Sequence, residues 1–445
     1  MIVLSNVILQ TKDPSLCLFL FLTNIVSAGD FCKSLQRLFS CWKKGILHLS
    51  NRDGDAQGRS EQPTTVKYRF TYIPELDGLR GISILLVFIH HIYYTVLPGG
   101  FLGVDIFFVL SGFLITSLLL KEWDQFGSLN LKLFYIRRAL RLMPALIILV
   151  LILGAYAFIF LDHLTAAKTY QGIWLTLSYV SNWIYAFRLR SADNPLGITW
   201  SLAIEEQFYL LWPFILSLAL LSKRFTHTRF VTILALSTVL VAFNRSLILE
   251  GNAMIARVYY PSDTRADALL IGCMIAFLMA HPTIPRQNVF RVLIRILALP
   301  ATVFLIYMAV FADWTYLLLF HGWMFTLIDV SAGIILTLVL VCPPRGLTLL
   351  LSFGPLVWVG RVSYGLYLWH WPVRWFVYHQ QALPRTAGDV ITAIVLSFAF
   401  TAFSYYVVEL AFLRWKTRFH SVRRPDIGIT TSIQIRNPTS RLSDP

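Results

Sequence analysis

The sequence predicts an all-α polytopic membrane protein with about ten transmembrane helices and both termini in the cytoplasm. The first observation is composition: 57% of the 445 residues are hydrophobic and only 14% are charged, against roughly a quarter in soluble domains. The second is that several apolar runs approach or exceed the ~20 residues that cross a hydrocarbon core. The third is that lysine and arginine concentrate on alternate loops, which is the pattern of the positive-inside rule.

Ten segments carry the apolar pattern of membrane helices. Their expected ranges are 79–97, 101–121, 142–161, 200–221, 230–249, 264–280, 292–312, 319–341, 361–379 and 387–412. The stretch 170–188 is aromatic and only moderately apolar, so we assign it to the outer interface of the membrane and not to a span.

The distribution of positive charge supports this topology. The loops assigned to the cytoplasm carry Lys121, Lys132, Arg137, Arg138, Arg141, Lys223, Arg224, Arg229, Arg286, Arg291, Arg295 and Arg345. The alternate loops hold only scattered cations, and an even number of spans then leaves both termini in the cytoplasm. The formal net charge of +15 would suggest nucleic-acid binding in a soluble protein. Here we attribute it to topology, and we expect a lipid bilayer and no nucleic-acid partner.

Three regions follow from this pattern. Residues 1–71 read as an N-terminal extension and linker, expected to be poorly ordered, because the apolar stretch 16–25 is too short to span and a polar linker follows it. Residues 72–415 form the membrane domain, and residues 416–445 form a basic cytoplasmic tail.

The cysteines point to no disulfide framework. The five cysteines show no CxxC motif and no histidine at metal-ligand spacing. The sequence therefore predicts no metal site and no bound cofactor.

The first predicted span carries ionisable residues, which are costly inside a membrane and therefore indicate function. Arg80 and His91 are eleven positions apart, about three helical turns, so both project from one face. Arg80 then lies near the cytoplasmic boundary and His91 near the midplane, where a neutral imidazole could deprotonate a hydroxyl. The alternative is that His91 only hydrogen-bonds a neighbouring helix while Arg80 extends to the lipid headgroups.

The second span and the loop after it carry further candidates. Asp105 is a charge early in the span, and Ser111 with Gly112 permits close helix approach. No nucleophile-elbow motif surrounds Ser111, so packing is the better interpretation of this serine. In the loop, Arg138 and Arg141 form a basic helical stripe. Guanidinium groups suit the phosphates of coenzyme A, and the alternative is a topology signal that binds lipid headgroups.

The fourth span opens on the outer side with Trp200 and Glu205. A carboxylate at the outer mouth could orient an imidazole or bind sugar hydroxyls. The alternative is that acidic residues in the first turns stabilise the helix and that Trp200 is an interface aromatic. Weaker candidates of the same kind are Arg265, Asp267, Tyr364, Tyr367 and His370.

Together these segments resemble acyltransferase family 3, the bacterial membrane O-acyltransferases that modify O-antigen, exopolysaccharide, peptidoglycan, Nod factors and some macrolides. The resemblance covers roughly residues 72–415. It runs in order through ELDGLRG, GVDIFFVLSGFLIT, FYIRRALRLMPA, TWSLAIEEQFYLLWP and VSYGLYLWHWP.

The resemblance implies that Arg80 and His91 occupy the family's arginine–histidine motif, with His91 as the catalytic base. It also implies that Arg138 and Arg141 engage an acyl-CoA donor from the cytoplasm together with Arg80, and that Glu205 belongs to the active site as a second catalytic residue. The further pocket candidates are Asp77, Asp105, Ser111, Trp200, Tyr364 and His370. Acyl-CoA, expected to be acetyl-CoA, is then a co-substrate, and the acceptor is a hydroxyl of a carbohydrate or glycolipid at the outer side of the inner (plasma) membrane.

One departure from the family and one rival function stay open. Some members carry a fused SGNH hydrolase-like domain, whereas this chain ends about thirty residues after its last predicted span. Either the membrane domain acts alone, or a separate periplasmic partner protein completes the transfer. A macrolide-type acceptor is also compatible with the sequence. The rival from another class is a transporter of a glycolipid or acylated product, which ten helices with intramembrane charges also fit. The lack of Gly/Pro-broken spans at matching positions of two halves argues against it.

Overall fold

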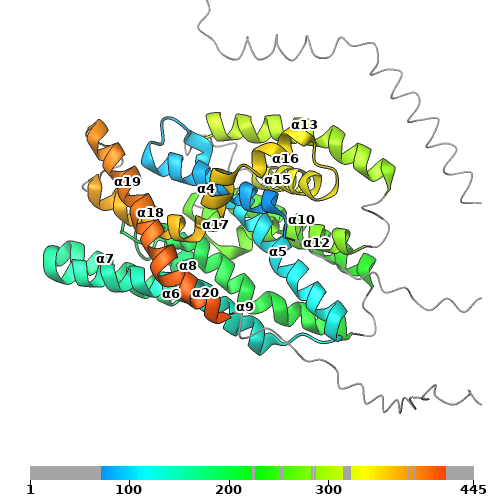
Figure 1. Ribbon diagram of the computed structural model, residues 1–445, viewed down its shortest axis with the longest axis horizontal. Helices are drawn as coiled ribbons and strands as arrows, with labels where there is room; N and C mark the ends of the chain where they lie inside the picture. Colours follow the sequence, from blue (N-terminus) through cyan, green and yellow to red (C-terminus); the bar gives the residue numbers. More distant parts are fainter. Residues whose placement is uncertain are drawn as a thin grey trace, which may run out of the picture. The chain divides into compact units, whose positions relative to one another are not determined.

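The computed structural model describes residues 72–416 except for the short stretches 223–225, 251–254, 282–283, 285–286, 314–321, 379–380, 382 and 385. The predicted extension 1–71 and all but the first residue of the predicted tail 416–445 lie outside the described residues. Within the described part of the chain every regular element is helical (Figure 1), which confirms the predicted all-α class.

The helices and helical turns follow one another along the chain. They are α4 Pro74–Ile92, η1 Pro98–Leu102, α5 Gly103–Phe126, α6 Leu131–Phe160, α7 His163–Leu177, α8 Ser181–Ala186, η2 Gly197–Thr199, α9 Trp200–Leu221, α10 His227–Glu250, α11 Ile255–Tyr259, η3 Ser262–Thr264, α12 Ala266–Ala280, α13 Asn288–Phe311, α15 Met324–Val341, α16 Arg345–Leu351, α17 Gly354–Arg361, α18 Ser363–Val377, α19 Ala387–Phe403, η5 Ser404–Glu409 and α20 Leu410–Lys416. Of the helical turns, η5 is a π-helical turn between α19 and α20.

Seven helices among the described residues are long and apolar enough to cross a membrane. They match the predicted spans 101–121, 142–161, 200–221, 230–249, 292–312, 319–341 and 387–412. The other three predicted spans coincide with α4, α12 and α18, which are shorter or carry charged residues. The chain is therefore a multi-pass helical membrane protein, and the number of ten crossings stays a prediction.

Helix α6 corrects one predicted boundary. The sequence predicts the arginine stripe in a loop before a span that starts at residue 142, whereas α6 begins at Leu131 and continues to Phe160. The side chain of Asn130 accepts a hydrogen bond from the backbone N–H of Leu133 at 3.0 Å, which caps this earlier start. The arginine stripe consequently belongs to the same rigid helix that enters the membrane.

The stretch 170–188 contains the second half of α7 and all of α8. Helix α7 packs on α6, and α8 packs on α9 and α11. Tyr179 and Arg188, each with a φ of 53°, form the turns that flank α8. The predicted position of this stretch at the membrane interface stays a prediction.

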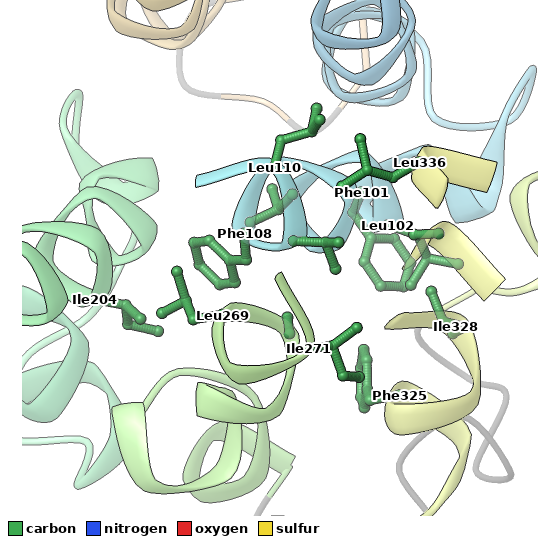
Figure 2. Packing of buried hydrophobic residues seen from close by; sticks show 14 of the residues in the cluster. Phe101, Leu102, Phe108, Leu110, Ile204, Leu269, Ile271, Phe325, Ile328 and Leu336 are labelled. Carbon is green, nitrogen blue, oxygen red and sulfur yellow. The ribbon is translucent and has the colours of Figure 1, made fainter. Parts of the chain in front are cut away.

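The core is centred on the contact between α5 and α12. A Cβ atom at Gly112 would lie 2.0 Å from the carbonyl oxygen of Leu269, and one at Gly272 would lie 2.1 Å from the carbonyl oxygen of Val109. The two backbones can approach this closely only because both positions are glycine, which confirms the expected role of Gly112. Figure 2 shows apolar side chains of α5, α9, α12 and α15 gathered around this contact.

Helix α4 is held between α5 on one side and α17 and α18 on another. A Cβ atom at Gly81 would lie 2.4 Å from the carbonyl oxygen of Leu356, and one at Gly360 would lie 1.8 Å from that of Asp77. The glycines therefore let α4 pack closely on α17. This packing places the face of α4 that carries Arg80 and His91 against α18.

Candidate functional site

An inner cavity lies among α4, α5, α6, α9 and α18, and with its open mouth it contains about 860 Å³ of empty space. Its polar lining consists of Arg80, Ser111, Arg138, Arg141, Ser201, Glu205, Tyr209, Ser363, Tyr364 and Tyr367. Two adjoining hollows share residues with it: one includes Arg138 and Arg141, and the other includes Arg80 and Arg141. The arginines therefore lie where the inner cavity meets the side of the protein that the charge pattern assigns to the cytoplasm.

The three arginines make the inner cavity suitable for an anion. Arg80 donates a hydrogen bond from Nη2 to the hydroxyl of Ser363 at 3.3 Å. The guanidinium of Arg138 lies 3.6 Å from the centre of the Tyr209 ring. Its Nε is buried without a hydrogen-bond partner among the described residues. Three guanidinium groups face a single carboxylate in this cavity, and planar guanidinium groups suit phosphate oxygens.

Glu205 lies in the inner cavity, which corrects its predicted position at the outer mouth. The hydroxyl of Ser111 donates a hydrogen bond to Oε1 of Glu205. Glu205 is five positions after Trp200, the first residue of α9. It therefore lies about 7.5 Å along the helix from that end. At this depth α5 presents Ser111 to it, and the three arginines line the same cavity. Ser111 therefore lines the cavity, which agrees with its place among the pocket candidates and not with a role in packing alone.

An outer cavity, which with its open mouth contains about 1320 Å³ of empty space, lies on the other side of the start of α9. Its aromatic lining consists of Tyr94, Trp200, Tyr259, Tyr260, Trp371 and Trp375, and its polar lining consists of His90, His91, Asp193, Arg374 and Gln381. Tyr260 lies between α11 and η3, and burial raises the pKa of its phenol to about 12, with Tyr185 nearby as the smaller cause. The phenol is therefore neutral at physiological pH and able to donate a hydrogen bond.

His91 lies at the outer cavity and contacts α18. Its Nδ1 is 2.9 Å from Nε2 of His370, and the two rings stack with their centres 5.1 Å apart. The ring of Trp371 meets it edge-on at 4.9 Å. Because Arg80 contacts Ser363 and His91 contacts His370, both side chains face α18, which confirms that they project from one face of their helix.

A short polar contact lies between the two cavities. The hydroxyl of Tyr367 donates to the carbonyl oxygen of Ile198 at 2.8 Å and lies 2.5 Å from the hydroxyl of Ser201. Ser201 and Tyr367 line the inner cavity, whereas Ile198 lines the outer one. These three residues therefore form part of the wall that separates the inner from the outer cavity.

The remaining pocket candidates lie in the two cavities and in the hollow beside Arg80. Tyr364 lines the inner cavity and donates from its hydroxyl to the carbonyl oxygen of Leu142 at 3.1 Å. Trp200 lines the outer cavity. Asp77 lies in the hollow beside Arg80 and accepts a hydrogen bond from Tyr72 at 2.7 Å.

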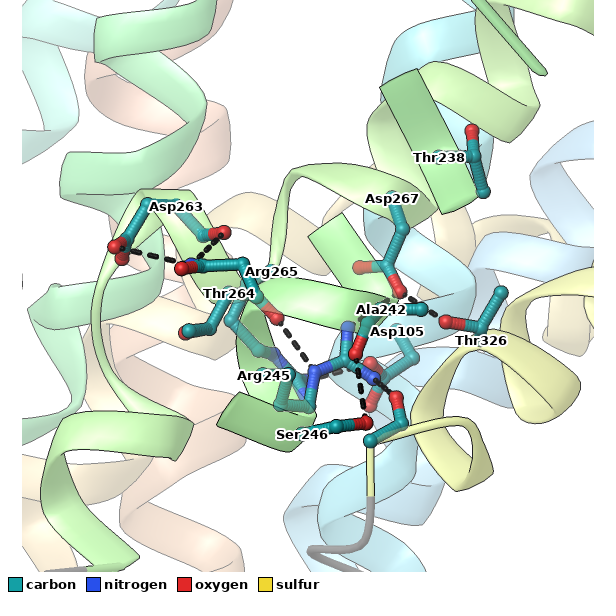
Figure 3. A network of polar contacts seen from close by, with 12 residues as sticks. Asp105, Thr238, Ala242, Arg245, Ser246, Asp263, Thr264, Arg265, Asp267 and Thr326 are labelled. Carbon is teal, nitrogen blue, oxygen red and sulfur yellow. Dashed lines mark hydrogen bonds and ion pairs between the residues drawn. The ribbon is translucent and has the colours of Figure 1, made fainter. Parts of the chain in front are cut away.

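Asp105 occupies a different place from the one expected. It is not among the residues that line either cavity; its carboxylate pairs with Arg265 inside the helix bundle. Arg265 stacks over the ring of Phe325 at 4.0 Å. A neighbouring pair of Arg245 and Asp267 belongs to the same buried ionic network (Figure 3). The buried carboxyl group of Asp329 also interacts electrostatically with both arginines. These ion pairs therefore link α5 and α10 to the start of α12. The weaker candidates Arg265 and Asp267 belong to this structural network.

Several lining residues were not singled out from the sequence. Ser201, Tyr209, Ser363 and Trp371 belong to motif blocks whose neighbours had been chosen, and Asp193 and Arg374 carried no distinguishing pattern. Within the described stretches no group of three or more histidine, cysteine, aspartate or glutamate side chains lies close enough to hold a metal ion.

Comparison with known proteins gives one family and several relatives. A family model described as an acyltransferase domain matches residues 73–409. Peptidoglycan O-acetyltransferase OatA of Listeria monocytogenes is 36% identical over 363 residues, which cover 78% of this chain and 56% of that protein. The putative peptidoglycan O-acetyltransferase YrhL of Bacillus subtilis is 34% identical over 351 residues, with 76% and 54% covered. A putative O-acetyltransferase of Staphylococcus aureus is 38% identical over 359 residues, with 78% and 58% covered.

The chain thus spans somewhat more than half the length of these relatives. No solved structure matches it.

Proposed function

This chain belongs to the acyltransferase family that its residues 73–409 match, and on this premise we propose that it transfers an acetyl group from acetyl-CoA to a glycan hydroxyl. The proposed acceptor is a peptidoglycan-type glycan, because two of the relatives are named for that substrate. The proposed location is the plasma membrane, with the donor arriving from the cytoplasm and the acceptor from outside. The observation that carries the proposal is the pair of cavities with opposite character that share one wall.

The inner cavity has the chemistry that a coenzyme A thioester requires. The donor carries a pyrophosphate and a ribose phosphate, and Arg80, Arg138 and Arg141 line the cavity at the side that the charge pattern assigns to the cytoplasm. The deeper lining around Phe107, Leu110 and Leu114 is apolar, as the uncharged pantetheine arm would need. We assign Glu205 a supporting role here, because it balances part of the positive charge and holds the hydroxyl of Ser111.

The outer cavity has the chemistry that a sugar requires. Aromatic rings that are partly exposed, such as Trp371 and Tyr260, can pack on the apolar faces of sugar rings. Asp193 and Arg374 supply an acceptor and donors for hydroxyl and carboxylate groups. A glycan bound here places its hydroxyl beside His91.

In the proposed reaction His91 is the general base. It takes the proton of the acceptor hydroxyl while the hydroxyl oxygen attacks the thioester carbonyl carbon. The carbon–sulfur bond then breaks, and coenzyme A leaves as a thiolate that takes a proton from solvent. The His91 imidazolium releases its proton to solvent, which restores the neutral base. The acetyl group passes from the inner to the outer side at the Ser201–Tyr367 contact, either directly or by way of an acyl-enzyme.

The test is acetyl-CoA turnover by purified protein in nanodiscs with muropeptide or chitooligosaccharide acceptors. We expect wild-type protein to release coenzyme A and to form an acetyl ester only when the glycan is present. His91→Ala should lose about 10²- to 10⁴-fold in rate, the range for removal of a general base. His163→Ala, which changes an exposed histidine at the start of α7, is the matched control and should keep full activity. A folded wild-type protein that neither binds nor cleaves acetyl-CoA would overturn the proposal and favour transport.

A further inference from the structure

His91 and His370 form a buried pair whose hydrogen-bond geometry determines where the protons lie. We propose that His370 is a positioning residue that fixes the tautomer of His91, so that Nε2 of His91 carries the lone pair offered to the acceptor. This inference rests on the proposed function, because it concerns the base of that reaction.

The backbone of α18 determines which nitrogen of His370 carries the hydrogen. Nδ1 of His370 lies 2.9 Å from the carbonyl oxygen of Leu366, one turn earlier on the same helix. A carbonyl oxygen can only accept a hydrogen bond, so Nδ1 of His370 must carry the hydrogen. A neutral imidazole has a single N–H, and Nε2 of His370 is consequently an acceptor.

The position of the hydrogen on His91 follows from its position on His370. Nε2 of His370 lies 2.9 Å from Nδ1 of His91. Since the His370 nitrogen accepts, Nδ1 of His91 must donate and therefore carries the hydrogen of that ring. Nε2 of His91 is left with a lone pair, and the described residues give it no hydrogen-bond partner. His91 lines the outer cavity, where the proposed acceptor would meet this nitrogen.

The surroundings favour two neutral rings over a charged pair. His370 is fully buried, between the rings of Phe88 and Tyr367 at 6.0 and 5.7 Å. Among the described residues no carboxylate hydrogen-bonds to either imidazole, and the nearby side chain of Arg374, on the same helix, is itself a cation. A charge on the ring of His370 in the resting protein would therefore be uncompensated in an apolar setting.

The pair also stabilises the product of proton transfer. When Nε2 of His91 takes a proton, the ring becomes an imidazolium and its Nδ1–H bond to His370 becomes charge-assisted, which strengthens it. Without an acceptor at His370, the ring of His91 can exchange tautomers and turn its N–H toward the hydroxyl that it should deprotonate. Loss of the hydrogen-bond partner of a metal-bound imidazole costs about 10- to 100-fold in affinity or activity, and we expect a loss of the same order for His91.

Two polar substitutions separate this role from packing. In His370→Gln the side-chain oxygen can occupy the position of Nε2 and accept from His91. In His370→Asn the shorter amide can still donate to the Leu366 carbonyl but does not reach His91. We expect the glutamine variant to keep kcat within about tenfold of wild type and the asparagine variant to lose about 10- to 100-fold. The KM for acetyl-CoA should be unchanged in both, because the donor cavity is intact.

The second readout is the protonation pattern of His91 by ¹⁵N NMR of histidine-labelled protein, assigned by comparison with His91→Gln. We expect hydrogen on Nδ1 in wild type and in the glutamine variant, and a mixture of two tautomers in the asparagine variant. Equal kcat values in the two folded variants, or hydrogen on Nε2 of His91 in wild type, would overturn the inference. Failure of the proposed function would look different: wild type would not turn over acetyl-CoA, while the NMR pattern would still report the tautomer.

Discussion

Replacing Arg138 with glutamine tests how the inner cavity holds its donor. The guanidinium lies 3.6 Å above the Tyr209 ring, and its Nε is buried without a hydrogen-bond partner among the described residues. It is therefore already oriented, and a phosphate oxygen would gain a charge-assisted hydrogen bond there. Such bonds contribute about 1.5–3 kcal/mol. We expect Arg138→Gln to raise the KM for acetyl-CoA by about 10- to 150-fold.

The assay compares two donors. Acetyl-CoA carries the nucleotide phosphates, whereas acetyl-pantetheine lacks them but presents the same thioester. If Arg138 binds phosphate, the substitution should raise the KM for acetyl-CoA and leave that for acetyl-pantetheine unchanged, so that the mutant discriminates less between the donors. Arg138→Lys should recover only part of the loss, since lysine keeps the charge but neither the planar fork nor the ring stacking.

Arg345→Gln is the control, because this arginine is exposed at the start of α16 and lines none of the cavities described above. Equal increases in KM for both donors in Arg138→Gln would refute the reasoning, since they would mean that the arginine shapes the cavity without contacting phosphate. An unchanged KM for both donors would place the phosphates elsewhere.

Three further predictions concern the acceptor and the fold. Trp371→Ala should raise the KM for the glycan about two- to tenfold, the cost of one aromatic contact, and should leave the KM for acetyl-CoA unchanged in the same assay; the reverse pattern would contradict an acceptor role. Gly112→Ala should destabilise the protein by about 1–3 kcal/mol or more through overpacking. Gly346→Ala is the control, because nothing lies within 4 Å of the added Cβ, and it should leave the melting temperature in detergent unchanged. Equal melting temperatures of the two variants would show that α5 and α12 can separate without cost. Asp105→Asn should cost about 3–5 kcal/mol, because it removes the carboxylate that pairs directly with the buried Arg265. Asp105→Leu combined with Arg265→Met should recover most of this loss; a double variant as unstable as the single one would mean that the pair does more than neutralise itself.

Local patterns predicted much of this protein well. Apolar runs of sufficient length identified the helices, because the hydrocarbon core imposes a minimum length that is visible in one dimension. Helical periodicity placed Arg80 and His91 on one face, and the contacts with α18 confirm it. The same logic missed the early start of α6, because the Asn130 cap and a run of good helix formers continue the helix beyond the apolar segment.

The tertiary structure decided which of these residues meet. Glu205 lies in the cavity of the arginines and contacts Ser111, and it does not contact His91. Which side chain lies beside a given position of a helix depends on how the helices pack, and a single segment does not contain this information. Asp105 looked like a pocket residue from its charge, but Arg265, 160 residues away in sequence, neutralises it inside the bundle.

By itself the sequence determined the class, the helices and the residue types of the site, because hydropathy, periodicity and charge are properties of a single segment. Only the tertiary structure could decide that His91 pairs with His370, 279 residues along the chain. It also decided that Arg80, Arg138 and Arg141 line one cavity and His91 another. The physical reason is that a hydrogen bond requires two groups within about 3 Å, and the distance between segments far apart in the chain is set by the packing of the helices that carry them.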